Sequence, residues 1–85
     1  MKLRVLYFAR LRESFGRSAE VIDLPDNGAD VAGLIACLRE RGSPWDTELA
    51  PGRTFRVAVD QDMATLQTAL HADAEVAIFP PVTGG

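Results

Sequence analysis

Two stretches near the start of the chain alternate in the way that β-strands do. Residues 2–9 are rich in β-branched and aromatic types, and residues 18–24 alternate as well. The first stretch has one fully apolar face, made of Leu3, Val5 and Tyr7. Its other face is partly apolar too, with Leu6 and Phe8 beside Arg4, so we expect both faces to contact other groups. Residues 10–17 predict a short helical turn or loop, and the two strands are expected to pair as a hairpin.

Residues 30–41 have the spacing of an amphipathic helix. Asp30 is a suitable N-cap, and Gly42 followed by Pro44 ends the pattern. The apolar positions fall at intervals of three and four residues, at Val31, Leu34, Ile35 and Leu38. Residues 45–50 predict a further short turn, with Trp45 as a lid on the end of the helix.

The second half of the chain predicts more strands and no second long helix. Residues 55–59 and 75–79 alternate as strands, and Pro80 with Pro81 ends the last one. Residues 60–74 are irregular apart from one short strand, with Leu66 and Leu70 as anchors. One amphipathic helix covers one apolar sheet face. The order of elements therefore predicts an α+β fold, a β-grasp (ubiquitin-like) domain over residues 1–79. We expect a mixed sheet of four to five strands covered by one main helix. In the β-grasp topology the first and last strands pair in parallel at the centre of the sheet.

Length and charge narrow the possible functions. A chain of 85 residues is one domain with a small core, which argues against an enclosed active site and for a module that works with a partner. The formal charge of −3 provides no positive footprint for nucleic acid. The single cysteine excludes an internal disulfide and a cysteine-built metal site. No stretch approaches the roughly 18 apolar residues of a membrane span, and the start does not resemble a signal peptide, so we expect a cytoplasmic protein without membrane contact.

The end of the chain is the candidate chemical feature. Residues 80–85 are expected to form a flexible tail about 20 Å long when extended, stiffened at its exit by Pro80 and Pro81. Gly84 and Gly85 then present a carboxylate without a neighbouring side chain. Such an end can enter a narrow channel and be attacked at its carbonyl carbon. The alternative is an ordinary frayed terminus.

Three segments resemble one family. Residues 75–85 read Glu-Val-Ala-Ile-Phe-Pro-Pro-Val-Thr-Gly-Gly, which is similar to the D-E-V-A-F-F-P-P-V-T/S-G-G end of the molybdopterin synthase small subunit. Residues 5–9, followed by Arg12 and Glu13, resemble the V-L-F-F-A…R-E start of that family, and residues 57–61 resemble its A-V-N-Q segment. Two departures stand out. Asp60 replaces the asparagine, and Asp73 lies where the family often has glycine, so Asp73 is expected to adopt the left-handed conformation.

The resemblance implies a role as sulfur carrier. An E1-like, ATP-dependent enzyme would adenylate the carboxylate of Gly85, and a sulfur donor would displace AMP to leave a thiocarboxylate. That end, with Gly84, would enter the large synthase subunit and donate sulfur to cyclic pyranopterin monophosphate, forming the molybdopterin dithiolene. Gly85 would then be a consumed cosubstrate. The chain would bind no cofactor, because ATP is used by the activating partner.

The resemblance and the strand parity together predict a partner surface. Phe8 and Phe79 fall opposite the residues that cover the helix, and exposed aromatics beside the tail indicate an interface. The resemblance adds Met63 and the tail residues Pro80, Pro81, Val82 and Thr83. The alternative is that Phe8 and Phe79 pack under residues 60–74. The remaining candidates are interpreted as ordinary surface or semi-buried groups: His71 in a loop, Cys37 on the helix, and Arg10, Arg12, Arg17 and Arg56 on a solvated rim.

Two other functions fit the same tail. One is a sulfur carrier for thiamine thiazole formation or tRNA thiolation. The other is a ubiquitin-like modifier that forms isopeptide bonds. Lys2 is the only lysine, so the chain has almost no site for self-linked chains.

Overall fold

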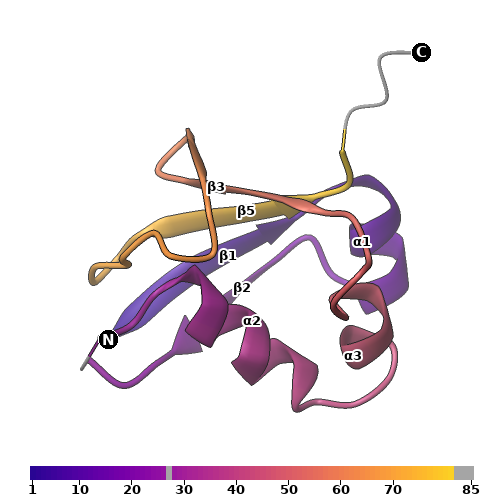
Figure 1. Ribbon diagram of the computed structural model, residues 1–85, viewed down its shortest axis with the longest axis horizontal. Coiled ribbons are helices and arrows are strands. Elements are labelled where there is room, and N and C mark those ends of the chain that lie inside the picture. The colour runs from indigo at the N-terminus through magenta and orange to yellow at the C-terminus, as the bar shows by residue number, and fades with distance from the viewer. Residues whose placement is uncertain (27, 82–85) are drawn as a thin grey trace.

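A parallel strand pair forms the centre of the fold. In the computed structural model, which describes residues 1–26 and 28–81, β1 (Lys2–Tyr7) lies beside β5 (Glu75–Phe79) with Val5 opposite Val76. The described residues form a five-stranded sheet in the order β2-β1-β5-β3-β4 (Figure 1). The pairing of the first and last strands at the centre confirms the predicted α+β, ubiquitin-like arrangement.

The outer strands are antiparallel to their neighbours. β2 (Ala19–Asp23) pairs with β1, and β3 (Arg56–Val59) pairs with β5 on the other side. β4 (Asp62–Ala64) closes a short hairpin on β3. The first strand is two residues shorter than predicted because Phe8 is already the N-cap of α1 (Ala9–Phe15), the segment for which a helical turn or loop was expected.

The main helix, α2 (Val31–Arg39), covers one face of the sheet (Figure 1). Its N-terminus is capped as predicted, because the Asp30 side chain accepts a hydrogen bond of 2.8 Å from the Gly33 N–H. Gly42 has a φ of 84°, a left-handed conformation that glycine adopts without a Cβ clash. The apolar stripe of α2 is buried, with Leu34 and Leu38 fully enclosed.

Three aromatic rings join the short helices to the sheet. Trp45 begins α3 (Trp45–Glu48) and stacks on Phe15 with ring centroids 3.8 Å apart. Both rings meet Tyr7 edge-on, at 5.1 and 5.5 Å. The Arg41 guanidinium lies over the Trp45 ring, with its Cζ 4.5 Å from the ring centroid. Trp45 is therefore a core residue as well as the predicted lid on the helix end.

The segment between β4 and β5 differs from the prediction at one anchor. Leu70 is buried as expected, but the Leu66 side chain is 45% exposed. Residues 65–70 are attached to α2 through the backbone instead, because the Ala32 N–H donates to the Leu66 carbonyl and the Val31 N–H donates to that of Thr68. This pairing satisfies the first N–H groups of the helix, and it leaves the Leu66 side chain at the surface.

Candidate functional site

The chain leaves the sheet beside α1. β5 ends at Phe79, and the half-buried Pro80 and Pro81 follow it away from the sheet (Figure 1). The Phe8 N–H donates a 3.3 Å hydrogen bond to the Ile78 carbonyl, which brings Phe8 to the end of β5. The structure thus brings together Phe8, Phe79, Pro80 and Pro81. The other predicted tail residues, Val82, Thr83, Gly84 and Gly85, lie outside the described residues.

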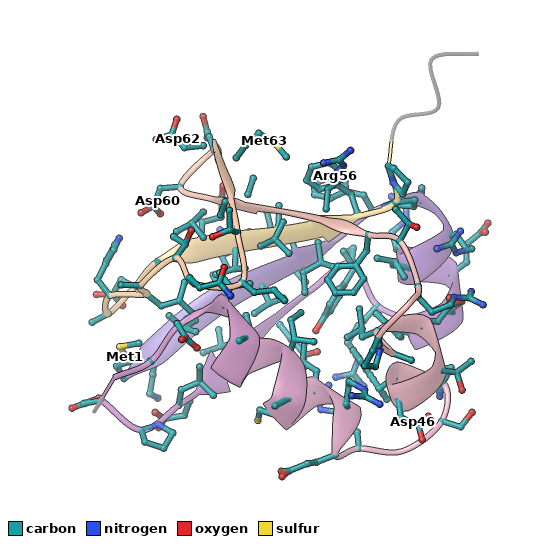
Figure 2. All side chains as sticks on the ribbon, viewed as in Figure 1. Met1, Asp46, Arg56, Asp60, Asp62 and Met63 are labelled. Carbon is teal, nitrogen blue, oxygen red and sulfur yellow. The ribbon has the colours of Figure 1, made fainter. Side chains whose placement is uncertain are left out.

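The sheet face opposite α2 carries two rows of side chains. Register alignment across the strands gives a first row of Leu6, Ala77, Ala58 and Met63. Phe79 and Arg56 form the second row, and Phe8 continues it beyond β1. Figure 2 shows Met63 and Arg56 pointing to the side of the sheet away from the helices. We call these seven residues the outer patch.

Exposure within the outer patch is uneven. Met63 is 64% exposed and Phe8 is 45% exposed, whereas Phe79 is half-buried. The alternative in which the 60–74 segment covers the aromatic residues is therefore wrong for Phe8. Large apolar side chains around small alanines make a shape on which another protein can pack. Sequence analysis did not assign four of the seven to the partner surface, although their parity in residues 2–9, 55–59 and 75–79 was a usable signal: Leu6, Arg56, Ala58 and Ala77.

A tight turn holds Met63 in position. Asp60 and Gln61 both have positive φ, 50° and 72°, which is the geometry of a two-residue hairpin turn between β3 and β4. Asp60 Oδ1 accepts a 3.0 Å hydrogen bond from the Glu75 N–H, and its Oδ2 lies 2.6 Å from His71 Nε2. The carboxylate therefore joins the turn to the start of β5. Asp73 has a φ of 65°, as expected where it replaces a glycine.

The Asp60–His71 pair shifts both pKa values. The hydrogen bond to Asp60 is the main cause that raises the pKa of His71 above its ordinary 6.5. The pKa of Asp60 is lowered from its ordinary 3.8, first by the Glu75 N–H and then by His71. Stability from His71 is present below about pH 6.5 and is lost as the pH rises through its folded pKa. Stability from Asp60 is present above about pH 3.8 and is lost as the pH falls through its folded pKa.

We therefore expect the imidazole of His71 to titrate above pH 6.5 in the folded protein. His71 is the single histidine, so its ring protons can be followed by NMR without ambiguity. Asp60→Asn should move the midpoint back toward 6.5, because the amide cannot form the ionic hydrogen bond. A midpoint at or below 6.5 in the unaltered chain would contradict the pairing.

Several other charged groups of the described residues have ion-pair partners. Arg10 and Arg53 pair with Glu48, and Arg17 pairs with Glu20. Cys37 is half-buried, as expected from its position off the helix stripe. Within residues 1–26 and 28–81, no group of three His, Cys, Asp or Glu side chains is arranged to hold a metal ion. The same residues include no helix that is long and apolar enough to cross a membrane.

Comparisons with known proteins agree on one class. The model of the ThiS family matches residues 5–85. The molybdopterin synthase sulfur carrier subunit of Haemophilus influenzae is 37% identical over 83 residues, covering 98% of this chain and 99% of that protein. Five further curated relatives have the same name, among them the one from Mycosarcoma maydis, which is 39% identical over 98% of this chain and 92% of its own.

Solved structures extend the agreement to the fold. A putative molybdopterin converting factor subunit 1 from Pyrococcus furiosus superposes with a TM-score of 0.81 at 29% identity, covering 96% of this chain and 99% of that one. SAMP1 of Haloferax volcanii, a small archaeal modifier protein, superposes with a TM-score of 0.80 at 25% identity over the full length of both chains. The match over residues 5–85 and the curated relatives lead to one conclusion: the chain belongs to the ThiS family.

Proposed function

We propose that this chain is the sulfur carrier subunit of a molybdopterin synthase, with the sulfur carried on Gly85. The observation that supports this most is the direction of β5, which ends beside the exposed Phe8 and leads through Pro80 and Pro81 toward the Gly-Gly end. The names of the curated relatives give the same function. The sheet supplies the rigid base, and the chemistry belongs to the end of the chain.

The carboxylate must be activated before it can take up sulfur. In the proposed cycle, a Gly85 oxygen attacks the α-phosphate of ATP, pyrophosphate leaves, and a glycyl adenylate forms. Sulfide, or a persulfide later cleaved by a thiol, attacks the carbonyl carbon and expels AMP. The resulting thiocarboxylate donates its sulfur to cyclic pyranopterin monophosphate, and water returns Gly85 to a carboxylate. Two deliveries supply the two dithiolene sulfurs.

Two partners follow from this cycle. An E1-like enzyme binds ATP and performs the adenylation, and the large synthase subunit binds the pterin and receives the tail. The chain itself holds no cofactor in this proposal. We place the reaction in the cytoplasm, where ATP is available. The outer patch is the surface that both partners would recognise, since it adjoins the tail exit.

Intact-mass spectrometry tests the proposal directly. The chain is coexpressed with an activating enzyme and a sulfur source, and its mass is compared with that of the chain expressed alone. We expect the gain that corresponds to exchange of one oxygen for sulfur, mapped by fragmentation to Gly85. Absence of this exchange under conditions that load a known carrier would overturn the proposal. A large synthase subunit that copurifies, rather than a thiazole synthase or a tRNA thiolase, identifies the acceptor.

The amines of the chain are poorly placed to be acylated by its own tail. Lys2 begins β1, and the parallel β5 runs away from it toward the tail exit. The α-amine of Met1 is bound by the carboxylates of Asp23 and Asp26, which raise its pKa and keep it protonated. This arrangement suits a carrier of an activated acyl group. A ladder of adducts that disappears when Gly85 is deleted would favour a protein modifier instead.

Phe8→Arg is expected to weaken binding to the large subunit at least ten-fold, because an exposed aromatic at an interface is replaced by a charge that must be desolvated. The monomer should remain folded, since Phe8 is 45% exposed. Val21→Arg is the matched control, because Val21 is 66% exposed on the edge strand β2, opposite Arg4 near the other end of β1. Calorimetry measures binding, and thermal melting measures stability. Unfolding of Phe8→Arg, or equal weakening by Val21→Arg, would contradict this role for Phe8.

A further inference from the structure

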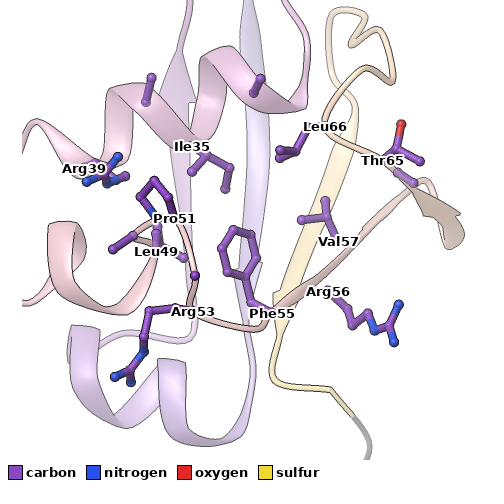
Figure 3. Close-up of a pocket in the computed structure, with 15 residues that line it drawn as sticks. Ile35, Arg39, Leu49, Pro51, Arg53, Phe55, Arg56, Val57, Thr65 and Leu66 are labelled. Carbon is purple, nitrogen blue, oxygen red and sulfur yellow. The ribbon is translucent and has the colours of Figure 1, made fainter.

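A pocket of about 470 Å³ lies on the opposite side of the sheet from the outer patch. It is bounded by α2, by the chain around Pro51 and by β3 with the start of the 65–70 segment (Figure 3). Phe55 lies at its centre, between Ile35 and Val57. Its size falls within the range of about 300–1,000 Å³ that is typical of ligand sites. The sulfur-carrier cycle uses none of these residues.

The helix presents a second apolar stripe to this pocket. Ala32, Ile35, Ala36 and Arg39 all line it and follow the i, i+3, i+4, i+7 spacing of one helix face. Ala32 and Ala36 are exposed, at positions where a solvent-facing helix usually has charged residues. Leu66, 45% exposed, continues the apolar surface across the mouth. The apolar surface therefore includes residues of both α2 and the segment after β4.

The charges around the pocket are all positive. Arg39 and Arg53 lie at its edge, whereas Arg56 lines it from β3 with a side chain that points away from it (Figure 3). No Asp or Glu is among the described residues that line it. This concentration is notable in a chain with a net charge of −3. Arg53 pairs with Glu48 at 2.8 Å, whereas Arg39 has no ion-pair partner within residues 1–26 and 28–81.

Arg39 also has an unused donor. Its Nε is buried and has no hydrogen-bond partner among the described residues. A buried N–H without an acceptor is unfavourable, and a guanidinium has the fork geometry that fits a carboxylate. A carboxylate bound beside Arg39 would supply the missing acceptor.

From these observations we propose that the pocket between α2 and β3 binds an acidic peptide segment of a partner protein, with a bulky apolar side chain on Phe55 and a carboxylate beside Arg39. Charge complementarity at Arg39, together with the exposed apolar residues Ala32, Ala36 and Leu66, favours a polypeptide with both acidic and apolar side chains over a small anion. Because the outer patch lies on the other face of the sheet, this segment can bind while the tail face is occupied. The site lies outside the sulfur-carrier cycle and does not depend on it.

Two labelled peptides test the site. In the first, aspartate and glutamate flank phenylalanine and leucine, and in the second, lysines replace the acidic residues. We expect the acidic peptide to shift the amide NMR signals of Ala32, Ala36 and Arg39 saturably, and the basic peptide to leave them unchanged. No sulfur chemistry is involved, so failure here leaves the proposed function intact.

Three variants distinguish binding in the pocket from general electrostatic attraction between the chain and an acidic peptide. Arg39→Gln should weaken binding of the acidic peptide about ten-fold, and Ala36→Leu, at an exposed helical position, should weaken it similarly by filling the pocket. Arg12→Gln, the same charge change on α1 outside the pocket, should leave affinity unchanged. Equal weakening by Arg12→Gln, equal binding of the basic peptide, or shifts confined to the outer patch would overturn the proposal. Tighter binding of decanoate than of the acidic peptide would also overturn it, because the site would then bind a small anion. Concentration-dependent shifts of the same signals without peptide would overturn it as well, because they would indicate a second copy of the chain.

Discussion

Removal of Gly85 is expected to abolish sulfur transfer while the domain stays folded, and so is the addition of one alanine after it. The physical reason is that the reacting carbon is the end of the chain itself. A shorter chain moves the carboxylate one residue, about 3.5 Å, out of reach of the activated phosphate. A longer chain places a side chain and a different carbonyl at the reacting position. Misplacement by about 1 Å already costs about 100-fold in a well-positioned reaction.

The measurement is sulfur loading by intact mass, followed by dithiolene formation with the large subunit. Folding is checked by thermal melting, and we expect no change, because glycine has no side chain to bury and position 85 comes six residues after the last residue of β5. Glu40→Gln, a change at the exposed C-cap of α2, serves as the control for handling and expression. Full loading of either end variant would contradict the role of Gly85.

Trp45→Ala is expected to have the largest effect on stability, a loss of about 3–5 kcal/mol of unfolding free energy. The ring is 7% exposed and stacks on Phe15, so its removal leaves a cavity under Tyr7. It also removes the surface on which Arg41 lies. A domain of this size has a total of about 4–13 kcal/mol, so the variant should be unfolded in part at physiological temperature.

Urea titration followed by circular dichroism measures this effect. Trp45→Phe keeps an aromatic ring for Phe15 and should lose less than half as much. Leu66→Ala provides the surface control, because that side chain is 45% exposed and should change stability by under about 1 kcal/mol. A small loss for Trp45→Ala would show that the stacked rings contribute little to the core.

The sheet and the main helix could be predicted because the spacing of apolar residues in each segment matches the face that the segment buries in the fold. The alternation of Leu3, Val5 and Tyr7 and the stripe of α2 each define one buried face. The error at Leu66 has a physical cause. An apolar side chain in an irregular segment looks like an anchor, whereas the structure anchors that segment by backbone hydrogen bonds to Ala32 and Val31. Backbone hydrogen bonds of this kind cannot be predicted from the types of the side chains.

The functional surfaces also include residues that the sequence could predict and residues that it could not. Phe8, Phe79 and Met63 could be found from parity and family resemblance, because a strand places alternate residues on one face. The pocket around Phe55 could not be predicted, since its walls come from α2, the Pro51 region and the β3–β4 hairpin. Only tertiary structure brings these segments together. The alanines at 32 and 36 were the available hint, because they extend an apolar stripe beyond the width that the core requires.

The parallel pairing of β1 with β5 has a consequence for how the protein is made. Arg4 lies opposite Glu75, so the central contact joins residues 71 positions apart (75 − 4). Closing so large a loop is entropically costly, and topologies dominated by distant contacts fold slowly. A nascent chain that has not yet released residues 75–79 lacks the strand between β1 and β3. The sheet is therefore completed by β5, the strand that leads toward the Gly-Gly end, so a truncated translation product without β5 has neither the complete sheet nor the proposed sulfur-carrying end.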